Sequence, residues 1–440
     1  MSSRLQFALI NSLPICQTVV ALNVQIINTG SELMLGRVLN THQQWLCREL
    51  ADLGYRVHRQ VAVDDSAGAI EQAVREGLSV ADLLITTGGL GPTSDDRTRD
   101  LIAGLLRLEL REDSTIVANI EKFFALRKRP MPAMTRVQAL VPHGAMVVPN
   151  AHGTAPGLII EVSPNPFRAN ATPSRLIMLP GPPRELRPMF SEQVVPWLRT
   201  QCPLANPFVC HTLKTTGLGE SVVQERIAGP LHKLTEAGLE LGYCARVGEV
   251  DVRVVAQGEE ARQKVIEAER IIRSVIGHHI FGHDDETLES VLIRLLTERR
   301  QTLALAESCT GGRIADRLTN VPGASAVLIC GLVTYSNEAK RAFLGVQEKT
   351  LATHGAVSEA VAREMAQGAR QRSGADYALA VTGIAGPTGG TTEKPVGTAF
   401  IALASAEHIK VLNPLNRYDR ETFKETTSQQ ALELLRRMVL

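Results

Sequence analysis

The sequence predicts an α/β protein of three domains, and three observations support this fold class. The chain has 440 residues, 44% of them apolar, which suffices for about three domains with separate cores. From Asn23 onward, short apolar runs alternate with stretches of helical periodicity, as is typical of βαβ units and a parallel sheet. The pattern changes near residue 207 and again at the polar joint His283–Glu286. We therefore expect an N-terminal extension over residues 1–22 and domains over residues 23–206, 207–283 and 284–440.

Regular patterns give the elements of the first domain in order. Asn40 or Thr41 can cap a helix, and Gly54 can end it in the left-handed conformation. A second helix is predicted where apolar residues recur at i, i+3, i+4 and i+8 from Ile70. The expected elements are a strand Val24–Ile27, a helix with Leu46, Leu50 and Leu53 on one face, a helix with Ile70, Ala73, Val74 and Leu78, a strand Leu83–Thr87, a helix with Leu101, Ile102 and Leu105, and a surface turn over Pro164–Pro173.

The second and third domains show shorter versions of the same patterns. For the second, a small α+β module, we expect strands Val209–Thr215 and Val250–Ala256 and helices around Val222 and Val265. The third domain is predicted to open with a helix and to alternate strands with helices. Its expected elements are a helix with Leu288, Val291, Leu292, Leu295 and Leu296 on one face, and strands Leu303–Ala306, Ala378–Thr382 and Thr398–Leu403.

Charge and cysteine content indicate a cytoplasmic protein that acts on small molecules. The 47 Lys and Arg residues against 46 Asp and Glu residues give a formal charge of +1, so no general attraction for nucleic acid is expected. Seven cysteines, none in a C-x-x-C pair, fit neither a disulfide framework nor a zinc site. Apolar runs fall short of the ~18–20 residues that span a bilayer, so we expect no membrane partner.

The first residues raise the alternative of a signal peptide. Arg4 precedes the apolar run Phe7–Ile10, but Asn11, Ser12 and Pro14 interrupt that run. We therefore expect a loose extension.

A serine in the third domain lies where nucleophiles are often found. Ser308 follows the strand Leu303–Ala306 and precedes a helix from Arg313, a junction rich in unpaired N–H groups that can stabilise an oxyanion. Two alternatives stay open: Ser308 caps the helix, or Cys309 is the attacking atom.

The third domain also offers candidate bases and a glycine-rich loop. Tyr335 or Lys340 could take the proton of a hydroxyl nucleophile, although a lysine in such a segment is commonly a solvated helix residue. The segment Thr382–Gly390 leaves a strand as a glycine loop whose amides could hold a phosphate.

In the first domain, two loops are predicted to face one crevice. Asn28–Leu33 and Thr86–Thr98 follow strands of one sheet, where α/β proteins bind ligands. Asp95 and Asp96 beside glycine amides combine metal-binding oxygens with anion-binding N–H groups, as a metal-bridged pyrophosphate requires. The alternative is that both aspartates cap the next helix.

Segments of the third domain resemble the nicotinamide mononucleotide amidohydrolase domain of the CinA (competence/damage-inducible) family. They are, in order, Ala306–Gly312, Thr334–Lys340, His354–Ser358, and Gly383–Pro387 with Glu393–Gly397. The resemblance implies hydrolysis of the carboxamide of nicotinamide mononucleotide to nicotinic acid mononucleotide and ammonia, without a cofactor. It implies that Ser308 attacks, that Tyr335 and Lys340 handle protons, that the amides of Gly311 and Gly312 face the oxyanion, and that the loop after Thr382 holds the phosphate together with Arg420. The implied substrate-binding residues are Cys309, Thr310, Gly311, Gly312, Thr382, Gly383, Gly386 and Arg420. Tyr418 and Lys424 stand where the family usually has a glycine and a second arginine.

The rest of the chain resembles the other parts of the same family. Asn28–Leu33, Thr86–Thr98, Gly153–Gly157 and Leu179–Glu185 resemble its N-terminal domain, which is similar to the three-layer α/β fold of molybdopterin-binding proteins and is associated with metal-dependent ADP-ribose pyrophosphatase activity. Thr215–Ser221 resembles its KH-like module. The resemblance implies a Mg, Mn or Co ion at Asp95 and Asp96, and a nucleotide site of Thr29, Gly30, Glu32, Asn40, Gly88, Gly89, Gly91, Thr93 and Thr98. Asp64 stands where the family usually has glycine. We also expect a homodimer.

Other readings of the sequence remain open. The first domain could be a pterin- or nucleotide-binding sensor without turnover, and a Ser-Lys pair could serve acyl transfer or peptide hydrolysis. The histidines are scattered along the chain, and the adjacent His278 and His279 point apart on a helix or strand. We therefore expect no histidine metal site.

Overall fold

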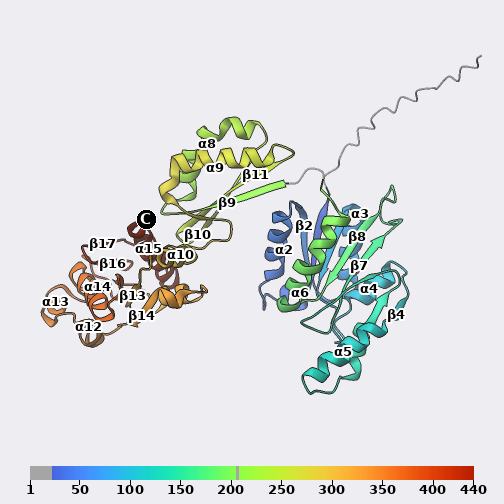
Figure 1. Ribbon diagram of the computed structural model, residues 1–440, viewed down its shortest axis with the longest axis horizontal. Helices are drawn as coiled ribbons and strands as arrows, with labels where there is room; N and C mark the ends of the chain where they lie inside the picture. The colour runs from blue at the N-terminus through green and yellow to red at the C-terminus, as the bar shows by residue number, and fades with distance from the viewer. Residues whose placement is uncertain (1–21, 205–207) are drawn as a thin grey trace, which may run out of the picture. The chain divides into compact units, whose positions relative to one another are not determined.

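The computed structural model describes residues 22–204 and 208–440, so the apolar run Phe7–Ile10, on which the signal-peptide alternative rests, lies outside the described residues. The chain divides into two compact units, shown in Figure 1. The first comprises the described residues up to Val209 together with Gln257–Ala261, and the second comprises Cys210–Ala256 and Arg262–Leu440. Within the described ranges, no helix combines the length and the apolar character needed to cross a membrane.

The first unit is a three-layer α/β structure around a six-stranded sheet of order β2-β1-β3-β8-β7-β6. Side chains alternate between its faces: Ile26 of β1 packs with helices α2 and α6, whereas Ile27 packs with α3 and α4. Its elements are β1 Val24–Thr29, α1 Ser31–Met34, α2 Thr41–Asp52, β2 Val57–Val63, α3 Ala67–Val80, β3 Leu83–Thr87, α4 Thr98–Leu105, β4 Leu110–Glu112, α5 Ser114–Leu126, a 3-10 segment Ala133–Ala139, β5 Leu140–Pro142, β6 Met146–Val148, β7 Gly157–Val162, β8 Ser174–Leu179, α6 Pro183–Met189, a π segment Phe190–Val194 and α7 Val195–Gln201.

Local sequence signals account for much of this unit. The side chain of Asn40 accepts a hydrogen bond from the N–H of Gln43 and so caps α2. Gly54 follows that helix with φ +87°, the left-handed conformation expected of it. The sheet is not wholly parallel, however, because β6 and β7 run antiparallel to their neighbours. The predicted turn Pro164–Pro173 makes this reversal, since it joins the antiparallel neighbours β7 and β8.

The second unit contains two sheets. One has the order β10-β11-β9-β12, and the other has the order β14-β13-β15-β16-β17, with β14, β13 and β15 parallel and β16 and β17 antiparallel. The elements are β9 Phe208–Thr216, α8 Glu220–Glu236, β10 Glu240–Arg246, β11 Glu249–Gln257, α9 Ala261–Ile276, a 3-10 segment Gly277–His279, β12 Ile280–His283, α10 Leu288–Arg299, β13 Leu303–Glu307, α11 Arg313–Thr319, a 3-10 segment Ala324–Ala326, β14 Leu328–Val333, α12 Asn337–Leu344, α13 Glu348–His354, α14 Glu359–Ser373, β15 Tyr377–Gly383, β16 Ala399–Ala404, β17 Ile409–Leu412 and α15 Arg420–Val439.

Helices cover both faces of the five-stranded sheet. Leu305 of β13 packs with α10, α11 and α15 on one face, and the neighbouring Ala304 packs with α14 on the other. Helix α15 also contacts the four-stranded part of the same unit. The Gln429 amide donates to Glu249 at 2.8 Å, and the Arg436 guanidinium donates to the carbonyl oxygen of His278 at 2.9 Å. The two sheets of this unit are therefore joined through one helix.

Candidate active sites

The parallel strands β13, β14 and β15 deliver the predicted residues of the third domain to one edge of their sheet. Ser308 follows β13 directly, Tyr335 follows β14, and Thr382 lies at the end of β15. Because parallel strands end at the same edge, three segments far apart in the sequence form one site there. The Ser308 residue is 8% exposed.

Lys340 is the closest base to this serine. Its Nζ lies 3.0 Å from Ser308 Oγ and also contacts the carbonyl oxygens of Thr334 at 2.8 Å and Tyr335 at 3.1 Å. The residue is only 2% exposed, so its interpretation as a solvated lysine is wrong. Burial lowers the pKa of Lys340 below the usual value for a lysine. As an ammonium, Lys340 donates to the Ser308 hydroxyl and to both carbonyls. As a neutral amine it has two N–H groups for the carbonyls and one lone pair that can accept the hydroxyl proton of Ser308.

The helix-capping interpretation of Ser308 is also wrong. Helix α11 has Gly312 at its N-cap without a capping side chain there. The buried carboxylate of Glu307 instead accepts hydrogen bonds from the amides of Gly312 at 3.0 Å, Ile314 at 3.2 Å and Ala315 at 2.9 Å. This role of Glu307 could not be predicted from the sequence, because a charged residue at the end of a strand gives no sign that its side chain will turn back onto the next helix.

The two glycine amides expected to face an oxyanion both have other partners. The N–H of Gly311 donates to the carbonyl oxygen of Ser308 at 3.2 Å, and that of Gly312 donates to Glu307. Both glycines have positive φ, +63° and +92°, so a side chain at either position would strain the turn. Their role in this structure is to shape the turn. The buried hydroxyls of Thr310 and Thr334 have no hydrogen-bond partner among the described residues.

Cys309 does not have the properties of an attacking thiol. It is 6% exposed, and burial raises its pKa to about 12. The thiol therefore stays protonated near neutral pH, and a protonated thiol is a poor nucleophile. Its sulfur packs against Gly383, where an added Cβ would lie 3.1 Å from Sγ. Of the two candidate nucleophiles, the geometry favours Ser308.

Arg420 and Tyr335 meet beside the glycine loop. One guanidinium nitrogen of Arg420 donates to the Tyr335 hydroxyl at 3.0 Å, and another donates to the carbonyl oxygen of Gly386 at 2.9 Å. The Tyr335 residue is 62% exposed. Arg420 thus orients the hydroxyl of Tyr335. Lys340 contacts Tyr335 through the backbone carbonyl and not through that hydroxyl. Thr382 uses its buried hydroxyl to donate to the carbonyl of Ala356 at 2.8 Å.

A second group of cations borders the turn of Gly311 and Gly312. Lys424 lines a surface hollow with these glycines and Arg313, and its Nζ lies 3.6 Å from where a Cβ on Gly311 would stand. Arg313 is paired with Glu421 and Glu425. Lys424 thus places a positive charge beside the backbone of Gly311 and Gly312, which have no side chains to block the approach of a ligand.

The first unit has a larger pocket at the carboxyl edge of its sheet. The loops after β1, β3 and β8 meet there, and Asp65, His42, Gln138 and Glu185 border it as well. The predicted residues that line this pocket are Thr29, Gly30, Glu32, Asn40, Gly88, Gly89, Gly91, Asp95 and Asp96. Two predicted residues are not among those that line it: Thr93 and Thr98.

Thr93 and Thr98 support this pocket from outside. Thr98 is fully buried, its hydroxyl lies 3.3 Å from that of Thr29, and its amide donates to the carbonyl of Gly89 at 3.1 Å. Thr93 donates from its amide, at 3.0 Å, and from its hydroxyl to Oδ2 of Asp96. Neither aspartate caps α4, whose N-cap is Arg97 and lacks a side-chain hydrogen bond, so the capping alternative is wrong.

Several pocket residues were missed because they lie far from the glycine loop in the sequence. The Asp65 carboxylate accepts hydrogen bonds from the amide of Ser31 at 2.7 Å and its hydroxyl at 2.8 Å, which holds the loop after β1. Burial lowers the pKa of His42. Asp64, by contrast, is exposed and accepts a hydrogen bond from the amide of Ser66.

Comparisons with known proteins match the three parts of the chain separately. Residues 25–200 match the family described as probable molybdopterin binding domain, residues 210–282 match the damage-inducible protein CinA KH domain, and residues 285–439 match the CinA C-terminal domain.

Full-length relatives resemble the chain over nearly all of it. A competence-damage inducible protein of Symbiobacterium thermophilum is 43% identical over 434 residues, covering 94% of this chain and 98% of the relative. A CinA-like protein of Akkermansia muciniphila is 43% identical over 414 residues, covering 93% and 96%. The crystal structure of the competence/damage inducible protein CihA from Agrobacterium tumefaciens is 44% identical and covers 34% of this chain and 93% of that chain, with a TM-score of 0.34.

Proposed function

The chain belongs to the CinA (competence-damage inducible) family, and we propose from this premise that its C-terminal part hydrolyses the carboxamide of nicotinamide mononucleotide. The products are nicotinic acid mononucleotide and ammonia. The observation that carries the proposal is the 3.0 Å separation between Lys340 Nζ and Ser308 Oγ in a buried site. A hydroxyl needs such a base to attack an amide near neutral pH.

The proton balance follows from the contacts of Lys340. Neutral Lys340 takes the proton from Ser308 as Oγ bonds to the carboxamide carbon. The resulting ammonium gives that proton to the leaving nitrogen, so ammonia departs and an acyl-serine remains. A water molecule then gives a proton to Lys340 and attacks the ester, and Ser308 regains its proton as the acid is released. Tyr335 with Arg420 and Lys424 supply polar and cationic groups for the rest of the nucleotide.

The test measures ammonia release from nicotinamide mononucleotide by the full chain. Ser308→Ala is expected to lower kcat by on the order of 10³-fold or more, and Lys340→Met is expected to do the same. Lys349→Met is the matched control, since it removes an exposed lysine of α13 and leaves Ser308 and Lys340 in place. Activity on esters or peptides with none on the nucleotide would favour the acyl-transfer or peptidase alternative.

For the N-terminal part we propose hydrolysis of ADP-ribose to AMP and ribose 5-phosphate, dependent on Mg²⁺, Mn²⁺ or Co²⁺. The supporting observation is one pocket lined by Gly88, Gly89 and Gly91 together with Asp95 and Asp96. Carboxylate oxygens suit these ions, and a bound ion would neutralise the charge that develops on a pyrophosphate. Binding of ADP-ribose without products would favour a sensor.

We also propose that the protein works in the cytoplasm as a homodimer, without a nucleic-acid partner. Sedimentation of the purified chain tests the oligomeric state.

A further inference from the structure

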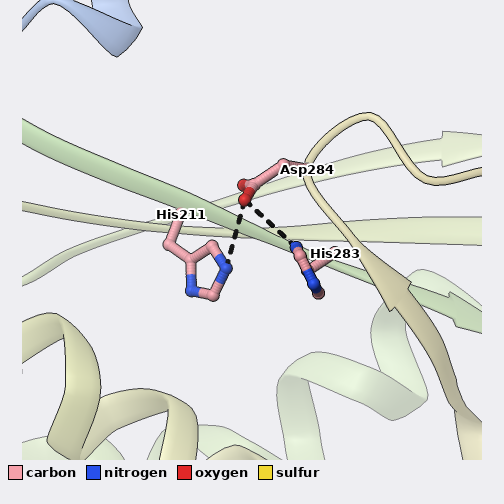
Figure 2. A group of neighbouring side chains, drawn as sticks. All are labelled: His211, His283 and Asp284. Atoms are coloured by element: carbon pink, nitrogen blue, oxygen red, sulfur yellow. Dashed lines mark hydrogen bonds and ion pairs between the residues drawn. The ribbon is translucent and has the colours of Figure 1, made fainter.

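Two histidines that are far apart in the sequence come together on the four-stranded sheet. His211 lies on β9 and His283 ends β12, and the antiparallel pairing of these strands leaves their ring centroids 5.6 Å apart. Figure 2 shows the carboxylate of Asp284 facing both rings. Its Oδ2 lies 3.3 Å from Nε2 of His211 and 3.3 Å from Nδ1 of His283.

The backbone fixes this carboxylate in place. Oδ1 of Asp284 accepts a hydrogen bond from the amide of Thr212 at 3.0 Å, and the amide of Asp284 donates to the carbonyl of Thr212 at 2.7 Å. One carboxylate oxygen is thus used by β9, and the other is directed at the two imidazoles.

Each imidazole has a glutamate at its other nitrogen. Nδ1 of His211 lies 3.0 Å from Oε2 of Glu269, and Nε2 of His283 lies 3.5 Å from Oε2 of Glu286. The glutamate keeps the imidazole proton on the nitrogen that it contacts, and the nitrogen that faces Asp284 then has a lone pair. Histidines that bind metals commonly have this arrangement.

We propose that His211, His283 and Asp284 bind a zinc ion, with water as a fourth ligand. Two imidazole nitrogens and one carboxylate oxygen are a ligand set that zinc favours. Tetrahedral bonds of about 2.0–2.1 Å place ligand atoms about 3.3 Å apart, which is the separation of Oδ2 from both nitrogens. The three ligand atoms lie within 4.8 Å of one another. The expectation of no histidine metal site rested on positions along the sequence, which do not tell that β9 and β12 pair and bring His211 beside His283.

The ion would link β9 to the segment that connects β12 with α10. It would therefore act on the stability of the second unit. The three ligands include none of the residues of the Ser308 site or of the pocket of the first unit, so this proposal is independent of both proposed reactions.

The test uses the full chain carrying Asp95→Asn and Asp96→Asn, which removes the carboxylates of the other candidate metal site. After chelator treatment, zinc binding is measured by calorimetry, and Co²⁺ serves as a probe whose visible bands report tetrahedral coordination. One equivalent is expected to bind, and thermal unfolding is expected to shift upward with zinc. His211→Asn and His283→Asn each lose a ligand and are expected to weaken binding by at least about 100-fold, since even loss of a second-shell partner costs 10–100-fold.

His232→Asn is the matched control. His232 also lies beside a carboxylate, with Nε2 3.4 Å from Glu236, but it lies on α8 and is not one of the three proposed ligands. Unchanged zinc binding in this variant together with loss in the other two supports the proposal. Absence of zinc binding, or equal binding in all variants, overturns it and leaves a cluster of histidines beside carboxylates. Circular dichroism confirms that each variant is folded.

Discussion

Glu307 holds the amide of Gly312 across the loop that carries Ser308, with its Oε2 3.0 Å from that nitrogen. The same carboxylate also accepts the amides of Ile314 and Ala315. The buried charge is therefore compensated by the first N–H groups of α11, and the position of the serine depends on it.

Glu307→Gln is expected to destabilise the second unit and to lower kcat. The two carboxylate oxygens of Glu307 accept three backbone hydrogen bonds, whereas the side-chain amide of glutamine has only one oxygen to accept them. Its NH₂ group would face backbone N–H donors. The expected loss is about 1–3 kcal/mol of unfolding free energy, measured by urea unfolding. Glu338→Gln, in the exposed first turn of α12, is the control. Equal stability of the two variants would contradict the role of Glu307.

The rate of nicotinamide mononucleotide hydrolysis is expected to fall as the pH drops through the pKa of Lys340. Only the neutral amine accepts the proton of Ser308, and burial lowers its pKa, so activity extends to lower pH than for an ordinary lysine. The pH profile of kcat/KM reports this group. Lys340→Arg keeps the charge but not the basic lone pair, and full activity in that variant would refute the assignment.

Unfolding measured at several pH values should reveal the same group. Between the lowered pKa of Lys340 and its usual value, the unfolded chain binds a proton that the folded chain does not. Stability therefore rises with pH in this window, by up to about 1.4 kcal/mol per pH unit. Lys340→Met is expected to reduce that slope. An unchanged slope would mean that the lysine is charged in the folded protein.

Lys424→Ala is expected to raise KM for nicotinamide mononucleotide by about tenfold, because loss of one charge-assisted hydrogen bond to phosphate costs about 1.5 kcal/mol. Hydrolysis of nicotinamide riboside, which lacks the phosphate, should change little. Lys394→Ala, whose Nζ donates to the carbonyl of His354, serves as the control. If both substrates lose equally, Lys424 does not act on the phosphate.

In the first unit, Asp96→Asn is expected to abolish metal-dependent release of AMP from ADP-ribose. Asp64→Asn is expected to leave that activity within about twofold, because Asp64 is exposed and is not among the residues that line the pocket. Both rates are measured with Mn²⁺ at saturation. A large loss in the Asp64 variant would show that this departure from the family pattern matters to the site.

Periodic segments could be predicted from the sequence, and contacts between distant segments could not. The strand Leu83–Thr87 and the buried stripe of α3 follow from local patterns. Strands β10, β14 and β17 were not predicted, and none of their residues is fully buried. The antiparallel pairing of β7 with β8 and of β6 with β7 depends on packing between distant segments. The local periodicity of the sequence does not show it.

The candidate sites show the same division. The strand-to-helix junction indicated Ser308, and Tyr335 and Lys340 were candidate bases from the sequence. The burial of Lys340 and the occupied amides of Gly311 and Gly312 arise from how three strands and a helix meet. The sequence shows which polar groups are present. Which of them keep a lone pair or an N–H group for a ligand depends on the contacts formed in the folded structure.

The contacts of α15 decide where this protein can be cut. Arg436 is 3% exposed and forms hydrogen bonds with Glu433 and with the backbone of His278. A fragment that starts after residue 283 would leave this guanidinium without its carbonyl partner and would open the surface around Gln429. Domain dissection should therefore separate the chain near residue 209 and keep everything beyond it in one piece.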